Sequence, residues 1–365
     1  MNIKSLLLGS AAALLAVSGA RAADAVVVAE PEPMEYVRIC DVYGAGFYYI
    51  PGTETCLKIG GLVRYEIGFS DNDDGWDKET LARLKFDARS ETEYGTFKRY
   101  IEIQASTGGG GHFDGAFVGV DDDGNSLYTH GWDYATGLSL RHAYFELGGL
   151  LVGHTDTLFD GDLSGEFDLG GGYRINQVRY TFDAGNGIAV SVGLEEEANN
   201  FDYMPLVVGK VSVAQGWGSV DVFAGYDDFH GEFALKGIAK VKATDALTVE
   251  LIATYESGAT FWGLLDAYEG YEWSVGGYLK YAVNDRLSIG AGGQYFGNYQ
   301  IGLTDLSGTQ DLGTAESSLN DYAIGAVIDY KIVENLDAKL AVNYNDGDTY
   351  SDGVFSGFLR LDASF

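Results

Sequence analysis

The 365-residue sequence is poor in proline, cysteine and basic residues. It contains 4 Pro and 2 Cys, and 23 Lys and Arg residues stand against 54 Asp and Glu residues, for a net charge of −31. A nucleic-acid-binding protein needs a basic surface to displace counterions from phosphates, so this class is excluded. Two cysteines are too few for a small fold built on disulfides. After the N-terminal segment, no apolar run approaches the ~18 residues that a membrane-spanning helix requires.

Glycine and aromatic residues, in contrast, are abundant. The chain holds 52 Gly, 25 Tyr and 19 Phe residues, and its mean hydropathy is −0.04. This aromatic content excludes a disordered chain. Two classes remain, a soluble all-β protein and an outer-membrane β-barrel.

The N-terminal residues 1–22 have the features of a secretory signal peptide. Lys4 supplies the positive start, an apolar stretch runs from Leu6 to Val17, and Ala20-Arg21-Ala22 is a small-x-small cleavage site. The apolar stretch is too short to span a membrane as a helix. We therefore expect export and a mature chain that begins at Ala23.

Both cysteines, Cys40 and Cys56, lie in the N-terminal segment 23–56. Export would place them in an oxidising compartment, where two cysteines allow a single pairing. A structural disulfide is the expected state, and free thiols are the alternative. None of the five histidines lies nearby, and two cysteines alone make a poor metal site. We expect no metal and no cofactor.

From residue 57 to residue 365 the sequence alternates apolar and polar residues with a period of two. The alternation forms about sixteen segments of roughly ten residues, which predicts antiparallel β-strands with one face in apolar surroundings. In one segment Ile188, Val190 and Val192 share a face. In the first segment the apolar parity leaves Arg64 and Glu66 on the opposite face.

The connections between these segments alternate in length. Short ones include 183–187 and 243–246. Long ones are expected at 70–78, 107–137, 156–173, 257–270 and 297–320. Short periplasmic turns opposite long extracellular loops are typical of an outer-membrane barrel, which must close because lipid offers no partner to an unpaired backbone group. About sixteen strands would leave a water-filled lumen without a dry centre.

Aromatic residues gather at the ends of the predicted strands, on the apolar parity. Two aromatic girdles that bound the lipid-facing band would explain this excess. The girdle at the long-loop ends is predicted to contain Tyr226, Tyr255, Tyr271, Tyr295, Tyr322 and Tyr344. The girdle at the short-turn ends is predicted to contain Tyr281, Tyr330 and Phe365.

A specific motif lies around the cysteines. The run Tyr-Ile-Pro-Gly-Thr-Glu-Thr-Cys at residues 49–56 follows Gly44-Ala45-Gly46-Phe47-Tyr48. This stretch resembles the opening of the alphaproteobacterial general porins of the rhizobial type. The resemblance implies a sixteen-stranded, homotrimeric diffusion pore in the outer membrane, after signal-peptide export. It also implies that the C-terminal aromatic residue, Phe365, serves as a signal for barrel assembly.

In general porins the third long loop folds inward and narrows the channel. By strand order that loop is 156–173, after a fifth strand at 150–154. Its carboxylates are Asp156, Asp160, Asp162, Glu166 and Asp168. The basic residues expected on lumen faces of the opposite wall are Arg64, Arg83, Lys85, Arg89 and Arg179. We expect the two sets to form a constriction with a mild preference for cations, and the alternative is that these charges are only solvated by the lumen.

The expected function is passive diffusion of ions and small hydrophilic solutes, for which no catalytic group is required. Expected partners are outer-membrane lipid, lipopolysaccharide and two further copies of the chain, and no nucleic acid. Three alternatives remain open: a structural or adhesive barrel without transport, a soluble secreted β-sandwich that binds a ligand, and an outer-membrane enzyme. The sequence contains no Gly-x-Ser-x-Gly elbow that would favour the enzyme.

Overall fold

A computed structural model describes residues 38–72, 75–107, 112–113, 117–120, 124, 126–128, 132–133, 136–196, 204–306 and 310–365. The expected signal peptide, 1–22, lies outside the described residues. No helix in these ranges is long and apolar enough to cross a membrane.

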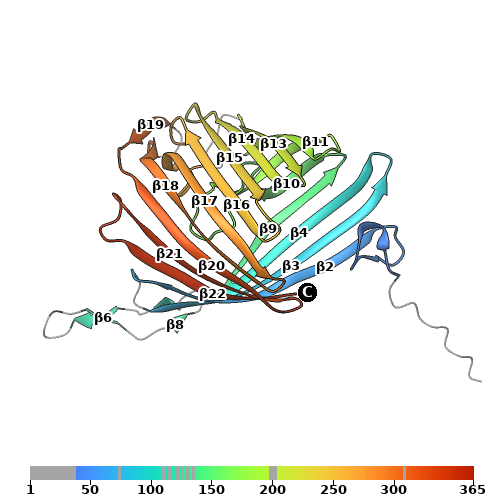
Figure 1. Ribbon diagram of the computed structural model, residues 1–365, viewed down its shortest axis with the longest axis horizontal. Helices are drawn as coiled ribbons and strands as arrows, with labels where there is room; N and C mark the ends of the chain where they lie inside the picture. The colour runs from blue at the N-terminus through green and yellow to red at the C-terminus, as the bar shows by residue number, and fades with distance from the viewer. Residues whose placement is uncertain are drawn as a thin grey trace, which may run out of the picture. The chain divides into compact units, whose positions relative to one another are not determined.

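The described chain forms a closed barrel of 16 antiparallel strands, each paired with its neighbours in sequence (Figure 1). This confirms the predicted fold and excludes a β-sandwich. The barrel strands are β2 (Cys56–Ser70), β3 (Trp76–Thr92), β4 (Gly95–Thr107), β9 (Thr136–Leu147), β10 (Leu150–Asp156), β11 (Arg174–Asp183), β12 (Ile188–Glu195), β13 (Leu206–Gln215), β14 (Gly218–Asp227), β15 (Glu232–Lys242), β16 (Leu247–Glu256), β17 (Glu269–Asn284), β18 (Leu287–Thr304), β20 (Asp321–Val333), β21 (Leu336–Gly347) and β22 (Val354–Ser364).

The barrel closes between its first and last strands. β22 pairs with β2 from Leu62↔Ser364 to Ser70↔Ser356. The terminal residue extends this pairing, because the backbone N–H groups of Phe365 and Gly61 each donate to the other's carbonyl at 3.1 Å. The seam therefore leaves no open edge, as lipid requires.

Several short elements lie outside the ring of strands. A 3-10 turn, η1 (Asp41–Tyr43), and β1 (Tyr48–Tyr49) precede β2, and β19 (Asp311–Glu316) pairs with β18. The connection between β4 and β9 holds β5 (His112–Phe113), β6 (Phe117–Val120), β7 (Ser126–Tyr128) and β8 (Trp132–Asp133), which pair as β5–β8 and β6–β7.

The two rims of the barrel differ in connection length, as predicted. On one rim, here called the short-turn rim, every turn has two or four residues. The other, the long-loop rim, carries the loops 157–173 and 257–268 among others. Two expected long loops are shorter than predicted: the strands β2 and β3 leave only 71–75 between them, and β18 with β19 takes up much of 297–320. The strand ends that project beyond the lipid are polar on both faces and do not alternate, so the period-two pattern could not predict these extensions.

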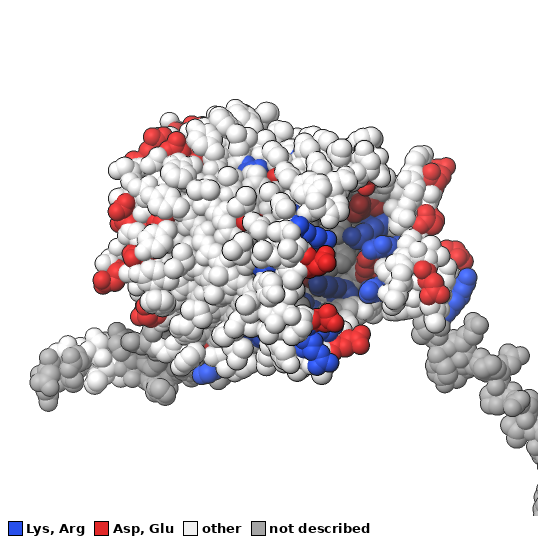
Figure 2. Space-filling model, in the orientation of Figure 1, with Lys and Arg blue, Asp and Glu red and all other residues white. Residues whose placement is uncertain are grey.

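The outer surface of the barrel is apolar. On β12 the side chains of Ile188, Val190, Val192 and Leu194 face outward, and Val192 is 54% exposed. The side of the barrel in view in Figure 2 is largely free of charged residues over the middle of the strands. Tyr226, Tyr255, Tyr295 and Tyr322 are exposed at the long-loop ends, and Tyr281, Tyr330 and Phe365 at the short-turn ends.

The girdle prediction is wrong for one residue, Tyr271. It is 3% exposed, its ring stacks on Phe296, and its hydroxyl donates to Asp321. The ladder between β17 and β18 is interrupted at Glu272 and Asn298 without a change of register, and Asn298 has a φ of +60°. The period-two pattern therefore fails at this strand end, and the residue turns inward.

The expectation of an entirely wet lumen is also wrong. A dry cluster fills one side of the barrel interior, where residues from two inward loops pack on the wall from β11 to β20. Its largest members include Phe159, Phe223 and Trp262. Apolar side chains within the long loops supply this core, so strand alternation could not reveal it.

A disulfide closes the segment before the barrel. Cys40 and Cys56 are bonded, with their Cα atoms 6.0 Å apart, and Cys56 is the first residue of β2. Phe47 packs beside the disulfide, and the guanidinium of Arg89 lies 5.1 Å from the centroid of its ring. The segment is thereby attached to the short-turn end of β3.

Candidate functional site

The loop 157–173, here called the inward loop, leaves the wall between β10 and β11 and enters the barrel. At its start, Glu195 of β12 accepts hydrogen bonds from the Leu158 backbone and the Thr157 hydroxyl, both at 2.6 Å. Further along, Glu250 of β16 accepts from the backbone and the hydroxyl of Ser164 at 2.8 and 2.7 Å. Buried strand carboxylates thus satisfy backbone donors that the loop removes from water.

The inward loop contacts a part of the wall that lies almost opposite to the strands from which it starts. The carboxylate of Glu166 lies 2.6 Å from Lys339 Nζ on β21 and 3.6 Å from Arg360 Nη1 on β22. Its backbone carbonyl accepts from Asn343 Nδ2 at 2.7 Å. Since β10 and β11 are the fifth and sixth strands of the ring, and β21 and β22 the last two, the loop crosses the lumen.

Phe167 anchors the tip of the inward loop. Its ring is 4% exposed and lies 6.1 Å from that of Tyr278. Two wall glycines make room for it, because a Cβ atom at Gly292 or Gly325 would approach the ring to 2.8 or 2.9 Å. A larger residue at either position would displace the ring from the wall.

The five predicted acidic residues have different environments. Asp162 and Glu166 line a cavity of the lumen, and Asp160 is exposed within the barrel. Asp168 shapes the loop instead, because it accepts a 2.6 Å hydrogen bond from the Leu163 backbone. Asp156 is the last residue of β10. Partial desolvation inside the barrel raises the pKa values of Asp160 and Asp162, and that of Asp168 to about 6.

A basic cluster lies on the part of the wall that the inward loop does not cover. It surrounds Glu102 of β4, which is 4% exposed. The carboxylate of Glu102 lies 3.2 Å from Arg141 Nε and 3.8 Å from both Arg83 Nε and Lys85 Nζ. Arg83 and Arg141 also donate to Gln104 Oε1 at 2.8 and 3.1 Å. We call Arg83, Lys85, Arg141 and Glu102 the Glu102 cluster.

The other three predicted basic residues lie outside the Glu102 cluster. Arg64 forms a bidentate ion pair with Asp362 of β22, with both hydrogen bonds at 2.7 Å. Arg179 is half-buried on β11. Arg89 does not join the Glu102 cluster, because it pairs with Asp87 at 2.6 Å and stacks on the N-terminal segment. The prediction that placed Arg89 in the basic wall overlooked this segment, which covers the short-turn end of β3.

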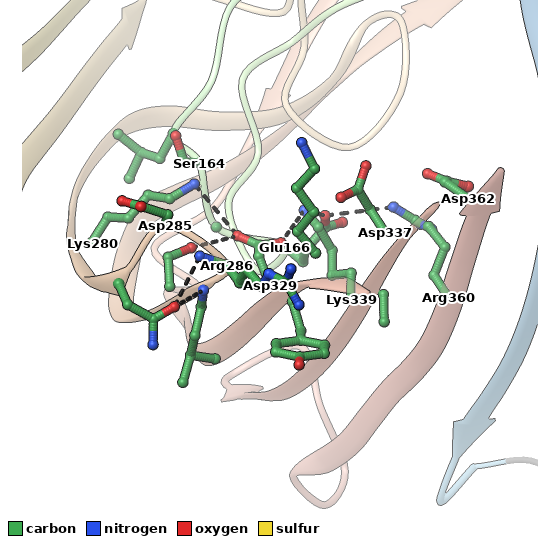
Figure 3. A pocket seen from close by; sticks show the side chains of 18 of the residues that line it. Ser164, Glu166, Lys280, Asp285, Arg286, Asp329, Asp337, Lys339, Arg360 and Asp362 are labelled. Carbon is green, nitrogen blue, oxygen red and sulfur yellow. Dashed lines mark hydrogen bonds and ion pairs between the residues drawn. The ribbon is translucent and has the colours of Figure 1, made fainter. Parts of the chain in front are cut away.

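Two cavities follow the open side of the lumen. One, of about 680 Å³, lies between the inward loop and the short-turn ends of β17 to β22 (Figure 3). The other, of about 330 Å³, lies among β2, β3, β21 and β22 and is lined by Glu66, Asp77 and Glu79. Arg360 of the first cavity and Glu66 of the second are paired at 2.5 Å, so the two cavities meet at this ion pair. Figure 2 shows basic side chains inside a hollow near the C-terminus.

The first cavity carries a band of alternating charge. Lys280 lies 3.4 Å from Asp329, and Asp329 lies 3.7 Å from Lys339. Glu166 and Arg360 continue the alternation toward β2 (Figure 3). Such a lining presents both signs of charge to a passing solute.

Sequence reasoning missed Glu102, Arg141, Lys339 and Arg360 as site residues. The parity of Glu102, Lys339 and Arg360 already assigned them to lumen faces, as the flanking Leu359 and Leu361 do for Arg360. Arg141 lies at a β-bulge in the pairing of β4 with β9, where parity gives no assignment. What was missing was which wall charges lie next to one another. In the described ranges, no group of three or more His, Cys, Asp or Glu residues has the geometry to hold a metal ion.

Comparison with known proteins connects this arrangement to a family. Residues 24–359 match the porin subfamily. Porin Omp2a of Brucella ovis is 41% identical over 310 residues, which cover 79% of this chain and 88% of the relative. Porin Omp2a of Brucella suis biovar 1 is 36% identical over 100% of both chains.

Solved structures show the same fold. OmpT, an outer membrane protein of Vibrio cholerae solved in a trimer form, has a TM-score of 0.56 at 12% identity and covers 86% of this chain and 100% of its own. A mutant of the Rh. blastica porin has a TM-score of 0.54 at 15% identity, over 85% of this chain and 100% of its own. With the family match and the closed barrel, these likenesses lead to one conclusion: the chain belongs to the porin subfamily and forms an outer-membrane channel for passive diffusion.

Proposed function

We propose that the inward loop is the constriction of this channel and that solutes pass between it and the wall formed by β22, β2, β3, β4 and β9. The observation that carries the proposal is the double ion pair of Glu166 with Lys339 and Arg360. A loop held at both walls divides the lumen. The dry cluster closes one half, and the charged wall lines the other.

The charges on the two sides support a transverse field in the constriction. Asp160, Asp162 and Glu166 are on the loop side, and the Glu102 cluster with Arg64 is on the wall side. A passing ion or dipolar solute would be oriented between them without a bond being made or broken. The acidic lining of the second cavity, Glu66, Asp77 and Glu79, would enrich cations at the long-loop mouth. The proposed preference is therefore mildly for cations.

Cysteine labelling tests the position of the constriction. The described residues contain no free cysteine, so a single introduced thiol is labelled alone. Asp162→Cys lies at the first cavity, and a bulky cationic thiol reagent added to it should reduce single-channel conductance and cation preference. Asp245→Cys, in the exposed turn 243–246, is the matched control. Equal conductance of the labelled Asp162→Cys channel before and after reaction would contradict the proposal.

Selectivity should also depend on pH. Burial raises the pKa of Asp168 to about 6, against a lowering by the hydrogen bond from Leu163. The loop therefore carries this charge above about pH 6 and loses it below, so cation preference should fall as the pH is lowered from 7.5 to 5. The raised pKa also means that the folded loop becomes more stable over the same interval. Reversal potentials in a KCl gradient measure how cation preference changes with pH, and this change should be smaller in Asp168→Asn. If the variant shows the same pH dependence as the wild type, the titrating group is not Asp168.

We further propose that the channel is a homotrimer surrounded by outer-membrane lipid and lipopolysaccharide. The apolar outer face and the exposed aromatic residues at both ends of the strands support the lipid contact. The trimeric OmpT structure supports the assembly by fold likeness. Conductance steps in groups of three in planar bilayers would support the trimer, and a monomer mass in mild detergent would contradict it.

A further inference from the structure

A second loop also folds into the barrel. The loop 257–268, here called the locking loop, joins β16 to β17. Its central residues Thr260 and Trp262 have no exposed surface, and Leu264 is nearly as buried. The sequence pattern predicted an external loop for this segment, which is wrong because its aromatic and aliphatic residues pack inside the barrel.

Two buried wall carboxylates hold the locking loop in place. Asp227 of β14 accepts a hydrogen bond from the Phe261 backbone at 2.8 Å. Glu256 of β16 accepts from the Thr260 hydroxyl at 2.7 Å and from its backbone at 3.2 Å. These carboxylates serve the locking loop as Glu195 and Glu250 serve the inward loop. The backbone of each loop is thereby tied to the wall independently.

Trp262 connects the two loops. Its indole N–H donates to the Thr157 hydroxyl at 3.2 Å, and that hydroxyl itself donates to Glu195. The Trp262 ring lies 5.3 Å from the ring of Phe159. The absence of a side chain at Gly225 makes room for the indole, because a Cβ atom there would lie 2.5 Å from it. Trp262 therefore packs under the point where the inward loop leaves the wall.

A second contact joins the other end of the inward loop. The Tyr173 hydroxyl donates to the Gly263 carbonyl at 2.9 Å. Gly171 has a φ of +66°, and a Cβ atom there would lie 2.3 Å from the Trp262 carbonyl oxygen. Both ends of the inward loop therefore meet the same short stretch of the locking loop, around Trp262 and Gly263.

We propose that the locking loop sets the position of the inward loop, with Trp262 as the positioning residue at the junction. The inference rests on the proposed constriction for its effect on transport, although the contact between the loops does not. The tip of the inward loop is held by the ion pairs of Glu166 and by the buried ring of Phe167. Its two ends meet the locking loop at Trp262 and Gly263, so loss of that contact frees the ends of the loop to move toward the open half of the lumen.

The test compares Trp262→Ala with Trp217→Ala. Trp217 lies exposed in the turn between β13 and β14, on the rim opposite to the one from which both loops enter the barrel. Deuterium uptake of the peptide 157–173 and single-channel recordings are measured on both folded channels. We expect faster uptake in Trp262→Ala and at least about tenfold more time in partly closed states, because truncation of a buried aromatic residue costs more than the free energy of a tenfold population change. Trp217→Ala should behave as the wild type.

The two readouts separate this inference from the proposed constriction. Unchanged uptake in 157–173 would overturn the inference, whatever the recordings show. Faster uptake with unchanged conductance and selectivity would support the positioning role of Trp262. It would overturn the proposal that the inward loop is the constriction. If Trp262→Ala does not yield a folded barrel, the variant Tyr173→Phe removes only the hydrogen bond from the Tyr173 hydroxyl to the Gly263 carbonyl of the locking loop. For this variant a smaller increase in the uptake of 157–173 supports the inference, and unchanged uptake overturns it.

Discussion

Neutralising the inward loop by Asp160→Asn, Asp162→Asn, Glu166→Gln and Asp168→Asn together is expected to shift the channel from cation toward anion preference by about tenfold in permeability ratio. A unit charge at ~4 Å from an ion in water contributes about 1 kcal/mol, or about fivefold in local ion concentration, and screening reduces the sum over several charges. The reversal potential in a KCl gradient measures the change.

The structure also predicts how that shift divides among the residues. Asp162 and Glu166 line the first cavity, and loss of Glu166 leaves Lys339 and Arg360 without their shared partner. The double variant Asp162→Asn with Glu166→Gln should therefore give most of the effect. Asp285→Asn with Asp337→Asn, which removes two other carboxylates of the same cavity on the short-turn rim, is the matched control. An equal shift in the control would mean that the rim, not the loop, determines selectivity.

Replacing Glu102 by glutamine is expected to have the largest effect of any single substitution on the wall. Glu102 is the carboxylate that Arg83, Lys85 and Arg141 share. Glutamine keeps the shape and leaves three cations with no opposing charge in the cluster. Permeability should move toward anions by about fivefold, from one unit charge at ~4 Å.

The opposite substitution provides the sign test. Arg141→Gln leaves Glu102 with fewer cations and should move the reversal potential toward cations. Glu93→Gln removes a carboxylate from the exposed turn between β3 and β4, outside the lumen. It should leave both the reversal potential and the permeability ratio unchanged. If Glu102→Gln and Arg141→Gln shift the potential in the same direction, the cluster does not act through its charge. The folded state of each variant is checked by its resistance to heat in detergent.

The barrel could be predicted because its pattern is local. On β12, each of the residues from Ile188 to Leu194 has the orientation that its parity predicts. A strand in lipid must alternate, and the short turns follow directly in sequence. Tyr271 shows the limit of this reasoning, since it has the parity of the outward residues and yet is buried where the ladder of β17 and β18 is interrupted.

The interior could be predicted only in part. Parity assigned Arg64, Arg83 and Lys85 to the lumen, but it did not reveal that Glu102 lies among the cations. It also gave no sign that Arg89 stacks against the N-terminal segment. The loops carry no period, so the buried positions of Phe159, Phe167 and Trp262 left no local signal.

The sequence by itself determined that this protein is a closed barrel of about sixteen strands with an apolar outer face and a charged inner one, because a period of two records the side of each residue. Only the tertiary structure decided which charges meet and how much of the lumen stays open. Thr157 and Trp262, and likewise Glu166 and Lys339, are far apart in the chain. They come together because ring closure and two inward loops place distant strands across one interior.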